Sequence, residues 1–345
     1  QLNFNDIHRS GWQKVIENLM CFSSSYGVYF DTYMDRTFHF AEEYMINSNI
    51  IPYTSQWIGI IHHLPNEEYT PNNTESMFNK KTFLDSLFCC KGIFVLSLRL
   101  KKWVVQKLKC INLQIPVEVL IHPTTFDTIS WSFDKFIENY HKKVVQVGSW
   151  MRNPFGIYEL HQRRLILSEL DDKYLYMNIG GEEYDFNFYV LEGKYMKSYI
   201  IPENLIYDDV FLEDGNKCVK YINKFITKIT KPIEIISHLD NNNYDTLLSK
   251  NIVFLQLIDA SAVNTVIECA VRNTPILLNR LPATEEILGS NYPFFYKNLT
   301  DAYTKLIDGN LIKKTHKYLK SLNKEKLTVN YFIKSLKESK IFKSL

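Results

Sequence analysis

Residues 251–289 read NIVFLQLIDASAVNTVIECAVRNTPILLNRLPATEEILG and carry the most informative pattern in the chain. Two apolar runs, Ile252–Ile258 and Pro275–Leu278, are bounded by polar residues, which is typical of strands buried on both faces of a parallel sheet. Between these runs, five apolar residues from Val263 to Val271 recur at helical spacing and should face the sheet. The stretch therefore predicts a strand, a polar turn, a helix and a second strand.

The other side of this predicted helix carries Ser261, Asn264, Thr265 and Glu268. A solvent-facing stripe remains one interpretation, but such stripes usually hold lysine, arginine and glutamate rather than three short hydrogen-bonding side chains. The free N–H groups of a helix start attract phosphate, and a carboxylate about 10 Å further along the axis could accept hydrogen bonds from ribose hydroxyls. The stripe predicts a nucleotide diphosphate site, with Asp259 as the cap of the helix.

A second stretch, VVQVGSWMRNPFGIYEL at residues 144–160, reads as a buried strand that runs into Gly148 and a loop before a helix. This order is that of a mononucleotide-binding unit, although its glycines are too few for the dinucleotide fingerprint. Arg152 lies in the loop, where a guanidinium could donate forked, charge-assisted hydrogen bonds to phosphate. The alternative is an ordinary surface arginine.

These residues resemble the donor-binding region of GT-B glycosyltransferases, particularly the retaining, family 4-like group that includes sucrose and glycogen synthase-like enzymes. The matching residues are Glu268, Thr274-Pro275 and Pro282–Glu286. The resemblance implies an α/β fold with two Rossmann-like domains facing a cleft. It also implies that Glu268 binds the ribose and that Arg152 stands where the first diphosphate-binding basic residue of the family falls.

The match is incomplete at two positions. The family has a first glutamate eight residues before the one matched by Glu268, where this chain has Ala260, and the usual Lys-Gly after Arg152 is missing. Two alternatives to a transferase therefore stay open. One is a nucleotide-sugar epimerase of the same architecture, and the other is a degenerate, non-catalytic nucleotide-binding module.

The amino-terminal half has one candidate for chemistry, the pair His62 and His63 in WIGIIHHLPN. The pair follows an apolar strand, at the end where open α/β sheets place ligands. Either histidine could act as a base or hydrogen-bond the transferred sugar, because the unperturbed pKa of imidazole lies near neutrality. Alternatively, one is a satisfied core residue and the other is exposed. Asp31 and Asp35 are expected to be caps rather than catalytic groups.

Length and composition favour two ordinary globular domains, since the chain has 345 residues, 46% of them hydrophobic and 23% charged. We predict an acceptor domain at 1–140, with the carboxyl-terminal helix 328–345 as a candidate addition, and a donor domain at 141–327. Residues 126–143 read as an aromatic-rich linker between them. Residues 171–216 read as a β-rich or irregular insertion.

The remaining features limit the partners. A net charge of +2 gives no argument for nucleic acid, and the basic region from Lys313 to Lys343 predicts a solvated face or, at most, peripheral membrane contact. The chain has no Asp-x-Asp and no cysteine or histidine spacing typical of a metal site, so neither a metal nor a cofactor is expected. No apolar stretch approaches 18 residues and the start lacks the apolar core of a signal peptide, which leads us to expect a cytoplasmic location.

Together these features predict a metal-independent hexosyltransferase. It would move a sugar from a nucleotide diphosphate donor, a UDP or GDP sugar, to a glycan, lipid or protein acceptor. Retention of configuration is implied by the resemblance alone. The predicted donor site consists of Gly148, Arg152, Ser261, Asn264, Thr265 and Glu268.

Overall fold

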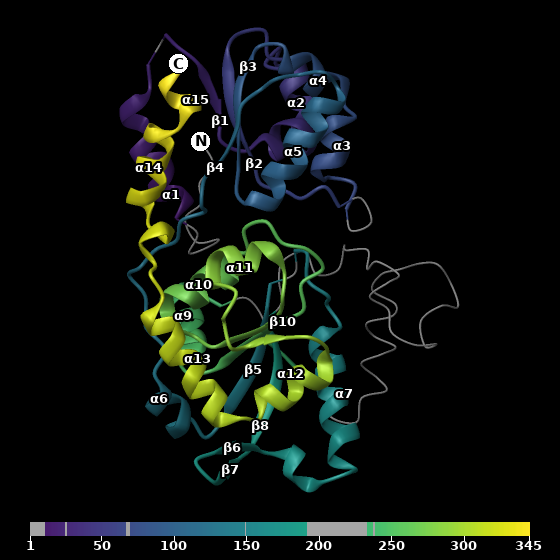
Figure 1. The fold of residues 1–345 in the computed structure, drawn as a ribbon, viewed down its shortest axis with the longest axis vertical. Helices are drawn as coiled ribbons and strands as arrows, with labels where there is room; N and C mark the ends of the chain where they lie inside the picture. Colours follow the sequence, from purple (N-terminus) through teal and green to yellow (C-terminus); the bar gives the residue numbers. More distant parts are fainter. Residues whose placement is uncertain (1–10, 25, 67–69, 149, 192–232, 237–238) are drawn as a thin grey trace, which may run out of the picture. The chain divides into compact units, whose positions relative to one another are not determined.

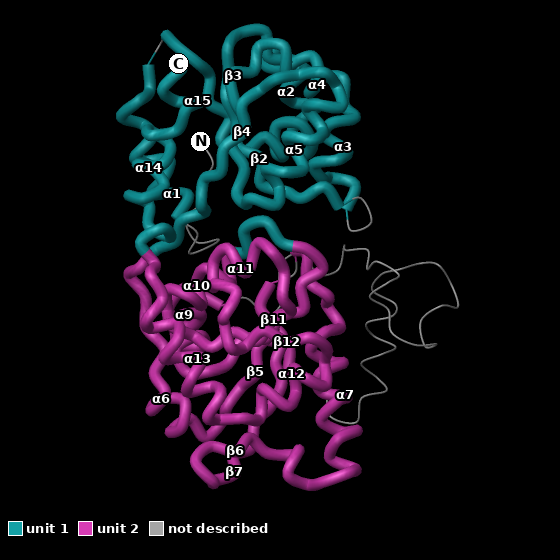
Figure 2. The backbone as a smooth tube through the Cα atoms, viewed as in Figure 1, with its two compact units in different colours: residues 1–125, 260–263, 325–345 teal, residues 126–259, 264–324 magenta. Residues whose placement is uncertain are grey.

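The computed structural model describes residues 11–24, 26–66, 70–148, 150–191, 233–236 and 239–345. The chain divides into two compact units, which Figure 2 shows in different colours. Unit 1 comprises Gln1–Thr125, Ala260–Val263 and Glu325–Leu345, and unit 2 comprises Phe126–Asp259 and Asn264–Lys324. The division follows residue 125, ahead of the predicted boundary at 140.

Unit 1 is built on a parallel sheet of four strands in the order β1-β2-β3-β4. The strands are β1 (Tyr29–Asp31), β2 (Trp57–Ile61), β3 (Cys90–Val95) and β4 (Val117–Val119). Strand β2 lies within WIGIIHHLPN, the segment in which the sequence predicted a strand before the two histidines. Strand β2 is buried throughout, with Trp57 and Ile61 in one hydrophobic core and Ile58 and Ile60 in another, so both faces of the sheet are covered.

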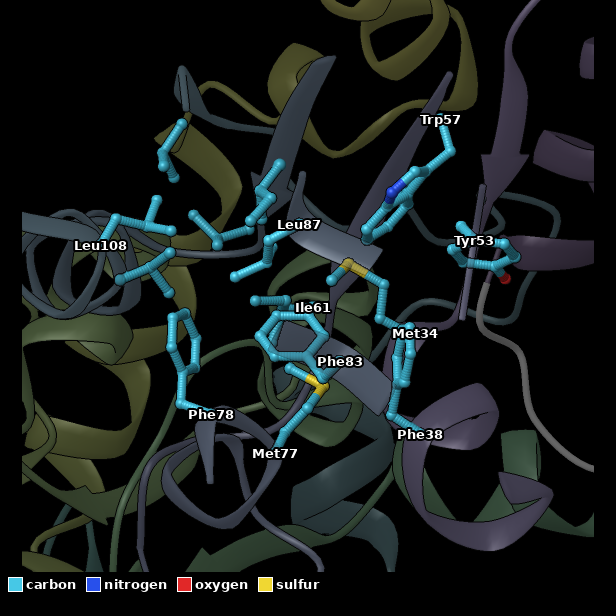
Figure 3. Packing of buried hydrophobic residues seen from close by; sticks show 14 of the residues in the cluster. Met34, Phe38, Tyr53, Trp57, Ile61, Met77, Phe78, Phe83, Leu87 and Leu108 are labelled. Atoms are coloured by element: carbon cyan, nitrogen blue, oxygen red, sulfur yellow. The ribbon is translucent and has the colours of Figure 1, made fainter. Parts of the chain in front are cut away.

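One face of this sheet is covered by helices that connect successive strands. Because each strand pairs with the next in sequence, right-handed crossovers place every connection on the same side. These elements are η2 (Arg36–Phe40, a π-helix), α2 (Glu42–Asn47), α3 (Thr74–Phe78), α4 (Lys81–Leu87) and α5 (Leu98–Cys110). Figure 3 shows the core beneath them, where aromatic and methionine side chains such as Phe38, Met77 and Phe83 pack together.

Helix α5 illustrates how the sequence forms these elements. The Ser97 hydroxyl accepts a hydrogen bond from the Leu100 amide and so caps the first turn. Leu100, Val104 and Leu108 then recur every four residues and are buried. The helix ends before Asn112, which has a positive φ of 59°.

The other face of the sheet is covered by helices from both ends of the chain. These are α1 (Trp12–Leu19), continued by the 3₁₀ turn η1 (Met20–Phe22), and α14 (Val329–Glu338) with α15 (Lys340–Lys343), which follow η6 (Glu325–Leu327). Figure 1 shows α1, α14 and α15 together on the side of the sheet away from α2–α5. Trp12, Phe332 and Ile341 share a core with Ile60 and Phe94 of the strands.

Unit 2 contains a parallel sheet of six strands in the order β12-β11-β10-β5-β8-β9. The strands are β5 (Lys142–Val147), β8 (Phe186–Leu191), β9 (Glu234–Ile236), β10 (Ile252–Leu255), β11 (Ile276–Asn279) and β12 (Phe295–Tyr296). This is the strand order of a Rossmann sheet. The chain starts in the middle at β5, adds β8 and β9 on one side, and then returns to add β10, β11 and β12 on the other side. The predicted strand–helix–strand pattern at 251–289 is confirmed by β10, α10 and β11.

The helices of unit 2 connect these strands. They are α6 (Phe133–Glu138), α7 (Gly156–Ser168), α9 (Asn241–Ser249), α10 (Asn264–Arg272), α11 (Pro282–Leu288), α12 (Leu299–Leu306) and α13 (Gly309–Ser321). A 3₁₀ turn, η3 (Asp172–Leu175), and a hairpin of β6 (Met177–Ile179) and β7 (Glu182–Tyr184) lie between α7 and β8. In the described part of the chain, no helix is long and apolar enough to cross a membrane.

Two predictions about segments of unit 2 were wrong, the second of them in part. Residues 126–143 are not a linker, because Trp131 and Phe136 are buried and the Trp131 indole donates to the Asn251 carbonyl at 2.9 Å. Residues 171–191 are β-rich as predicted, with β6, β7 and β8, but β8 is not part of an insertion because it pairs with β5 along its whole length. The aromatic residues Phe186 and Phe188 are buried in that sheet. Residues 192–216 lie outside the described part.

Candidate functional site

The strand order of unit 2 identifies the position of a ligand site within it. The sheet changes direction of growth between β5 and β10, which are adjacent and parallel. In open α/β sheets, ligands bind beyond the carboxyl ends of the two strands at such a switch point, because the loops that follow them diverge. Here the two loops begin at Gly148 after β5 and at Gln256 after β10.

Gly148 and Arg152 lie in the first of these loops. Gly148 has a φ of +75°, and a Cβ atom added there would lie 3.1 Å from the Arg152 guanidinium carbon. Glycine is therefore required both for the backbone conformation and for the approach of the arginine. Arg152 is only 8% exposed, so it is not the surface arginine of the alternative interpretation.

Arg152 joins this loop to the first turn of α10. Its Nη1 donates to the Trp150 carbonyl at 2.7 Å, and its Nη2 donates to the Thr265 hydroxyl at 2.9 Å. A bridge between Arg152 and Leu257 holds the same loop against the end of β10. The structure thus brings together two predicted donor-site residues that are 113 positions apart in the chain.

Helix α10 begins at Asn264, three residues later than predicted. Asp259 lies five residues before Asn264, outside the N-cap position, and Ser261 is not part of the helix. Ser261 belongs to unit 1, where its hydroxyl lies 3.4 Å from that of Ser97. From Asn264 to Glu268 the axial distance is about 6 Å, one turn rather than the predicted two. Asn264 remains partly exposed at the helix start.

Glu268 is almost completely buried, at 3% exposed, and takes part in a polar network that the sequence analysis missed. The Tyr244 hydroxyl donates to its Oε2 at 2.7 Å, and Arg272 Nη1 lies 3.9 Å from the same oxygen. Arg272 also donates to Asp245 at 2.6 Å. Burial raises the pKa of the Glu268 carboxyl, while the Arg272 charge and the Tyr244 hydrogen bond oppose that rise. Within the described chain no hydrogen bond or ion pair is formed by Oε1.

His62 and His63 lie in unit 1, directly after β2, and Asp35 fixes their backbone. The two oxygens of the buried Asp35 carboxylate accept the amide of His62 at 2.7 Å and that of His63 at 3.1 Å. Asp35 was expected to be a cap, but its side chain makes no cap hydrogen bond to η2, the helix it precedes, and binds these two amides instead. The sequence offered no sign that its partners would be the two histidines, 27 and 28 residues away.

The ring contacts of the histidines define their protonated nitrogens. His62 Nε2 donates to the Thr32 carbonyl at 2.9 Å and His63 Nδ1 to the Asn72 carbonyl at 3.0 Å, since a carbonyl can only accept. The Tyr33 hydroxyl lies 3.2 Å from His63 Nε2, so both ring nitrogens of His63 have partners. The alternative interpretation required one of the two histidines to be exposed. Neither is, because His63 is buried and His62 is partly buried.

His62 is unsuited to the role of a base at neutral pH. Burial lowers its pKa to about 4, although the Asp35 charge and the Thr32 hydrogen bond both act in the opposite direction. The expectation of a pKa near neutrality was therefore wrong for this residue. Its ring also packs against Tyr33 and Trp12, with centroids 4.5 and 4.8 Å away. An uncharged His62 can still accept a hydrogen bond at Nδ1 from a sugar hydroxyl.

In the described part of the chain, no group of three or more histidine, cysteine, aspartate or glutamate side chains is arranged to hold a metal ion. The cationic groups nearest the switch point are instead the Arg152 guanidinium and the amino end of α10. Backbone N–H groups and a buried guanidinium are both suited to a phosphate-bearing ligand.

No protein-family model matches the sequence, and no curated protein matches it significantly. Solved structures do match, at low sequence identity. Trehalose-6-phosphate synthase OtsA aligns with a TM-score of 0.57 and 8% identity, over 95% of this chain and 77% of its own. Anabaena HepE, in complex with UDP-glucose, aligns with a TM-score of 0.57 and 9% identity over 87% and 75% of the two chains. TarM aligns with a TM-score of 0.52 and 13% identity, over 87% of this chain and 53% of its own. The predicted GT-B fold is thereby confirmed.

Proposed function

We propose that this protein is a glycosyltransferase that transfers a hexose from a nucleotide diphosphate sugar to an acceptor. The observation that carries the proposal is the meeting of Arg152 with the first turn of α10 at the switch point of the unit 2 sheet. The GT-B fold supports it, because HepE was solved with UDP-glucose bound. UDP sugars are accordingly the first donors to test, with GDP sugars second.

In this proposal the donor lies along the first turn of α10. The diphosphate accepts hydrogen bonds from the free N–H groups of that turn and from Arg152, with Asn264 and Thr265 beside it. One turn further on, Glu268 Oε1 accepts the ribose hydroxyls, while Tyr244 and Arg272 hold Oε2. Gly148 allows the loop to approach because it has no side chain.

The same groups would assist departure of the nucleotide diphosphate. Negative charge develops on the leaving group as the glycosidic bond breaks, and fixed N–H dipoles with a guanidinium stabilise that charge without reorganisation. The proposed mechanism therefore needs no divalent cation to balance that charge. Retention of configuration is part of the proposal on the ground of the resemblance alone. His62 contributes a hydrogen bond to a sugar hydroxyl rather than proton abstraction, because a pKa of about 4 makes its imidazole a weak base at neutral pH. His63 is not used for proton abstraction either, because both of its ring nitrogens have partners within unit 1.

One observation favours a second candidate, a module that binds a nucleotide without turning it over. Ala260 stands where the resembling family has its first glutamate, and it is buried. An alanine cannot supply the polar contact that a glutamate would make to the transferred sugar.

Donor binding and turnover separate these two functions. Thermal unfolding measured with UDP, GDP and their hexose conjugates should show a higher melting temperature with one nucleotide family, because a ligand of the folded state alone stabilises it. Arg152→Ala should abolish most of that shift for the diphosphates but keep any shift from the nucleoside. Release of nucleotide diphosphate with acceptor extracts would support the transferase, binding without release would support the module, and a flat panel would refute both.

A further inference from the structure

Unit 1 carries exposed apolar side chains at the end of its first helix. Met20 is 57% exposed, Phe22 39% and Tyr26 88%, although most large apolar residues of unit 1 are buried in its two cores. Leu345, at 49% exposed, donates its amide to Phe342, whose ring centroid lies 5.8 Å from that of Phe22. We call Met20, Phe22, Tyr26 and Leu345 the apolar tip.

Exposed lysines lie on α14 and α15, next to Phe22 of the apolar tip. Lys334, Lys337, Lys340 and Lys343 of α14 and α15 are all exposed, and Glu338 is the acidic residue among them. Lys337 Nζ lies 4.8 Å from the centroid of the Phe22 ring, which places the basic and apolar groups side by side. Figure 1 shows the helices that carry them, α1, α14 and α15, next to one another.

Neither feature is explained by the folding of unit 1. Phe332, Leu336 and Ile341 already bury the inner side of α14 and α15, so the outer lysines and the tip add nothing to the core. Single exposed apolar residues are common on soluble proteins, but adjacent ones within a basic rim are typical of surfaces that lie on a membrane. Aromatic rings enter the headgroup region, while lysines meet anionic headgroups.

We propose that this face of unit 1 binds the surface of an anionic lipid bilayer. Phe22, Tyr26 and Met20 enter the interface, and the four lysines of α14 and α15 contact the lipid headgroups. The exposed charges of α14 and α15 are four lysines and one glutamate, and α1 adds Lys14 and Glu17, so the positive balance is complementary to such a surface. The inference does not depend on the proposed reaction, although it would place the enzyme where lipid-linked acceptors are found.

Co-sedimentation of the whole protein with vesicles tests the proposal. Vesicles of phosphatidylcholine mixed with phosphatidylglycerol should bind the protein, vesicles of phosphatidylcholine alone should not, and added salt should weaken binding. The double variant Lys337→Glu with Lys340→Glu should lower the affinity for these vesicles at least about tenfold, because each lysine near an anionic surface raises the affinity roughly fivefold. Phe22→Ser with Tyr26→Ser should lower it as well.

The matched control is Lys102→Glu with Lys109→Glu, two exposed lysines of α5 on the opposite face of the sheet. It makes the same change of net charge and should bind the mixed vesicles like the wild type. Equal losses in both charge variants, or no binding of the wild type, would overturn the proposal. So would a concentration-dependent dimer that Phe22→Ser with Tyr26→Ser abolishes, since the tip would then bind a second copy. The UDP-sugar thermal shift, measured on every variant, reports separately on donor binding.

Discussion

The Glu268 carboxylate has partners within the protein at one oxygen and none in the described chain at the other. Tyr244 and Arg272 both contact Oε2. A buried carboxylate is costly unless it is hydrogen-bonded and paired, so these contacts explain how the protein keeps one here. The sequence identified Glu268 from its position on the predicted helix. It could not identify Tyr244, because nothing local indicates a hydrogen bond to a residue 24 positions away.

Replacing Glu268 with glutamine tests its role as a ribose ligand. The amide can still accept from Tyr244, so we expect the protein to fold with a stability loss of about 1–2 kcal/mol. Affinity for UDP should fall about tenfold, because a charged acceptor of ribose hydroxyls becomes a neutral one. Isothermal titration with UDP and its 2′,3′-dideoxy analogue measures this. If the dideoxy analogue loses as much affinity in the variant as UDP does, Glu268 does not bind the ribose.

The lowered pKa of His62 makes stability depend on pH. Folded His62 titrates at about pH 4, whereas the unfolded residue titrates near its ordinary 6.5. As the pH falls from 6.5 towards 4, the unfolded state gains a proton that the folded state does not, so stability falls, by up to about 3 kcal/mol. His62→Gln should lack this part of the pH dependence. Urea unfolding of both proteins at neutral and acidic pH measures the difference, and parallel curves would contradict the assigned shift.

At the scale of elements, the sequence predicted which segments form strands and helices better than where they begin. The apolar spacing of residues 263–271 predicted α10, yet the helix starts at Asn264 because Ser261 lies in a segment that belongs to unit 1. Strand β8 was missed because its residues, FNFYVL, follow a stretch rich in charge and lack the flanking pattern of a βα unit. Its identity depends on pairing with β5, a contact that no local pattern encodes.

Helix α7 contains a carboxyl group that should destabilise the protein when it is charged. Burial raises the pKa of Glu159, in the first turn of α7, to about 7, although Arg163 acts in the opposite direction. Between pH 4.5 and 7 the unfolded residue loses its proton while the folded one keeps it, so stability declines as the pH rises through that window. Glu159→Gln should therefore be more stable at pH 8, by up to about 3 kcal/mol, and unchanged at pH 4.5.

Thermal unfolding of Glu159→Gln at the two pH values checks this expectation. Glu169→Gln is a suitable control, because Glu169 lies at the other end of the same helix and is exposed. A loss of stability at pH 8 in Glu159→Gln would show that the charged carboxylate is needed near the start of α7.

At the scale of the whole molecule, chain length and composition predicted two domains, and the resemblance to GT-B glycosyltransferases implied the fold that the solved structures confirm. Which segments belong to each domain was harder to predict, because a helix packs on a sheet through contacts between residues far apart in the sequence. Residues 325–345 cover the second face of the unit 1 sheet, more than 200 positions after β4. Their amphipathic pattern shows that α14 has an apolar side, and the partner of that side follows only from the sheet topology.

The contribution of α14 to unit 1 can be measured with two neighbouring residues. Phe332 is fully buried against the sheet, so Phe332→Ala should cost about 3–5 kcal/mol through lost burial and the cavity left behind. Lys334→Ala, two positions on and exposed, should change stability by less than about 0.5 kcal/mol. Denaturant unfolding followed by the fluorescence of Trp12, which contacts Phe332, reports on both variants. Equal effects would mean that α14 does not pack on unit 1 in solution.

The use of the last helices to cover the first sheet has a consequence for protein synthesis. A ribosome delivers the strands β1–β4 early, but α14 and α15 only after all of unit 2 has been translated. Until then the nascent chain presents Ile58, Ile60 and Phe94 on a sheet face that α1 covers only in part, a form of surface that aggregates readily. Unit 1 is thus begun first and completed last, and its nascent form is a natural client for chaperones that hold apolar surfaces during translation.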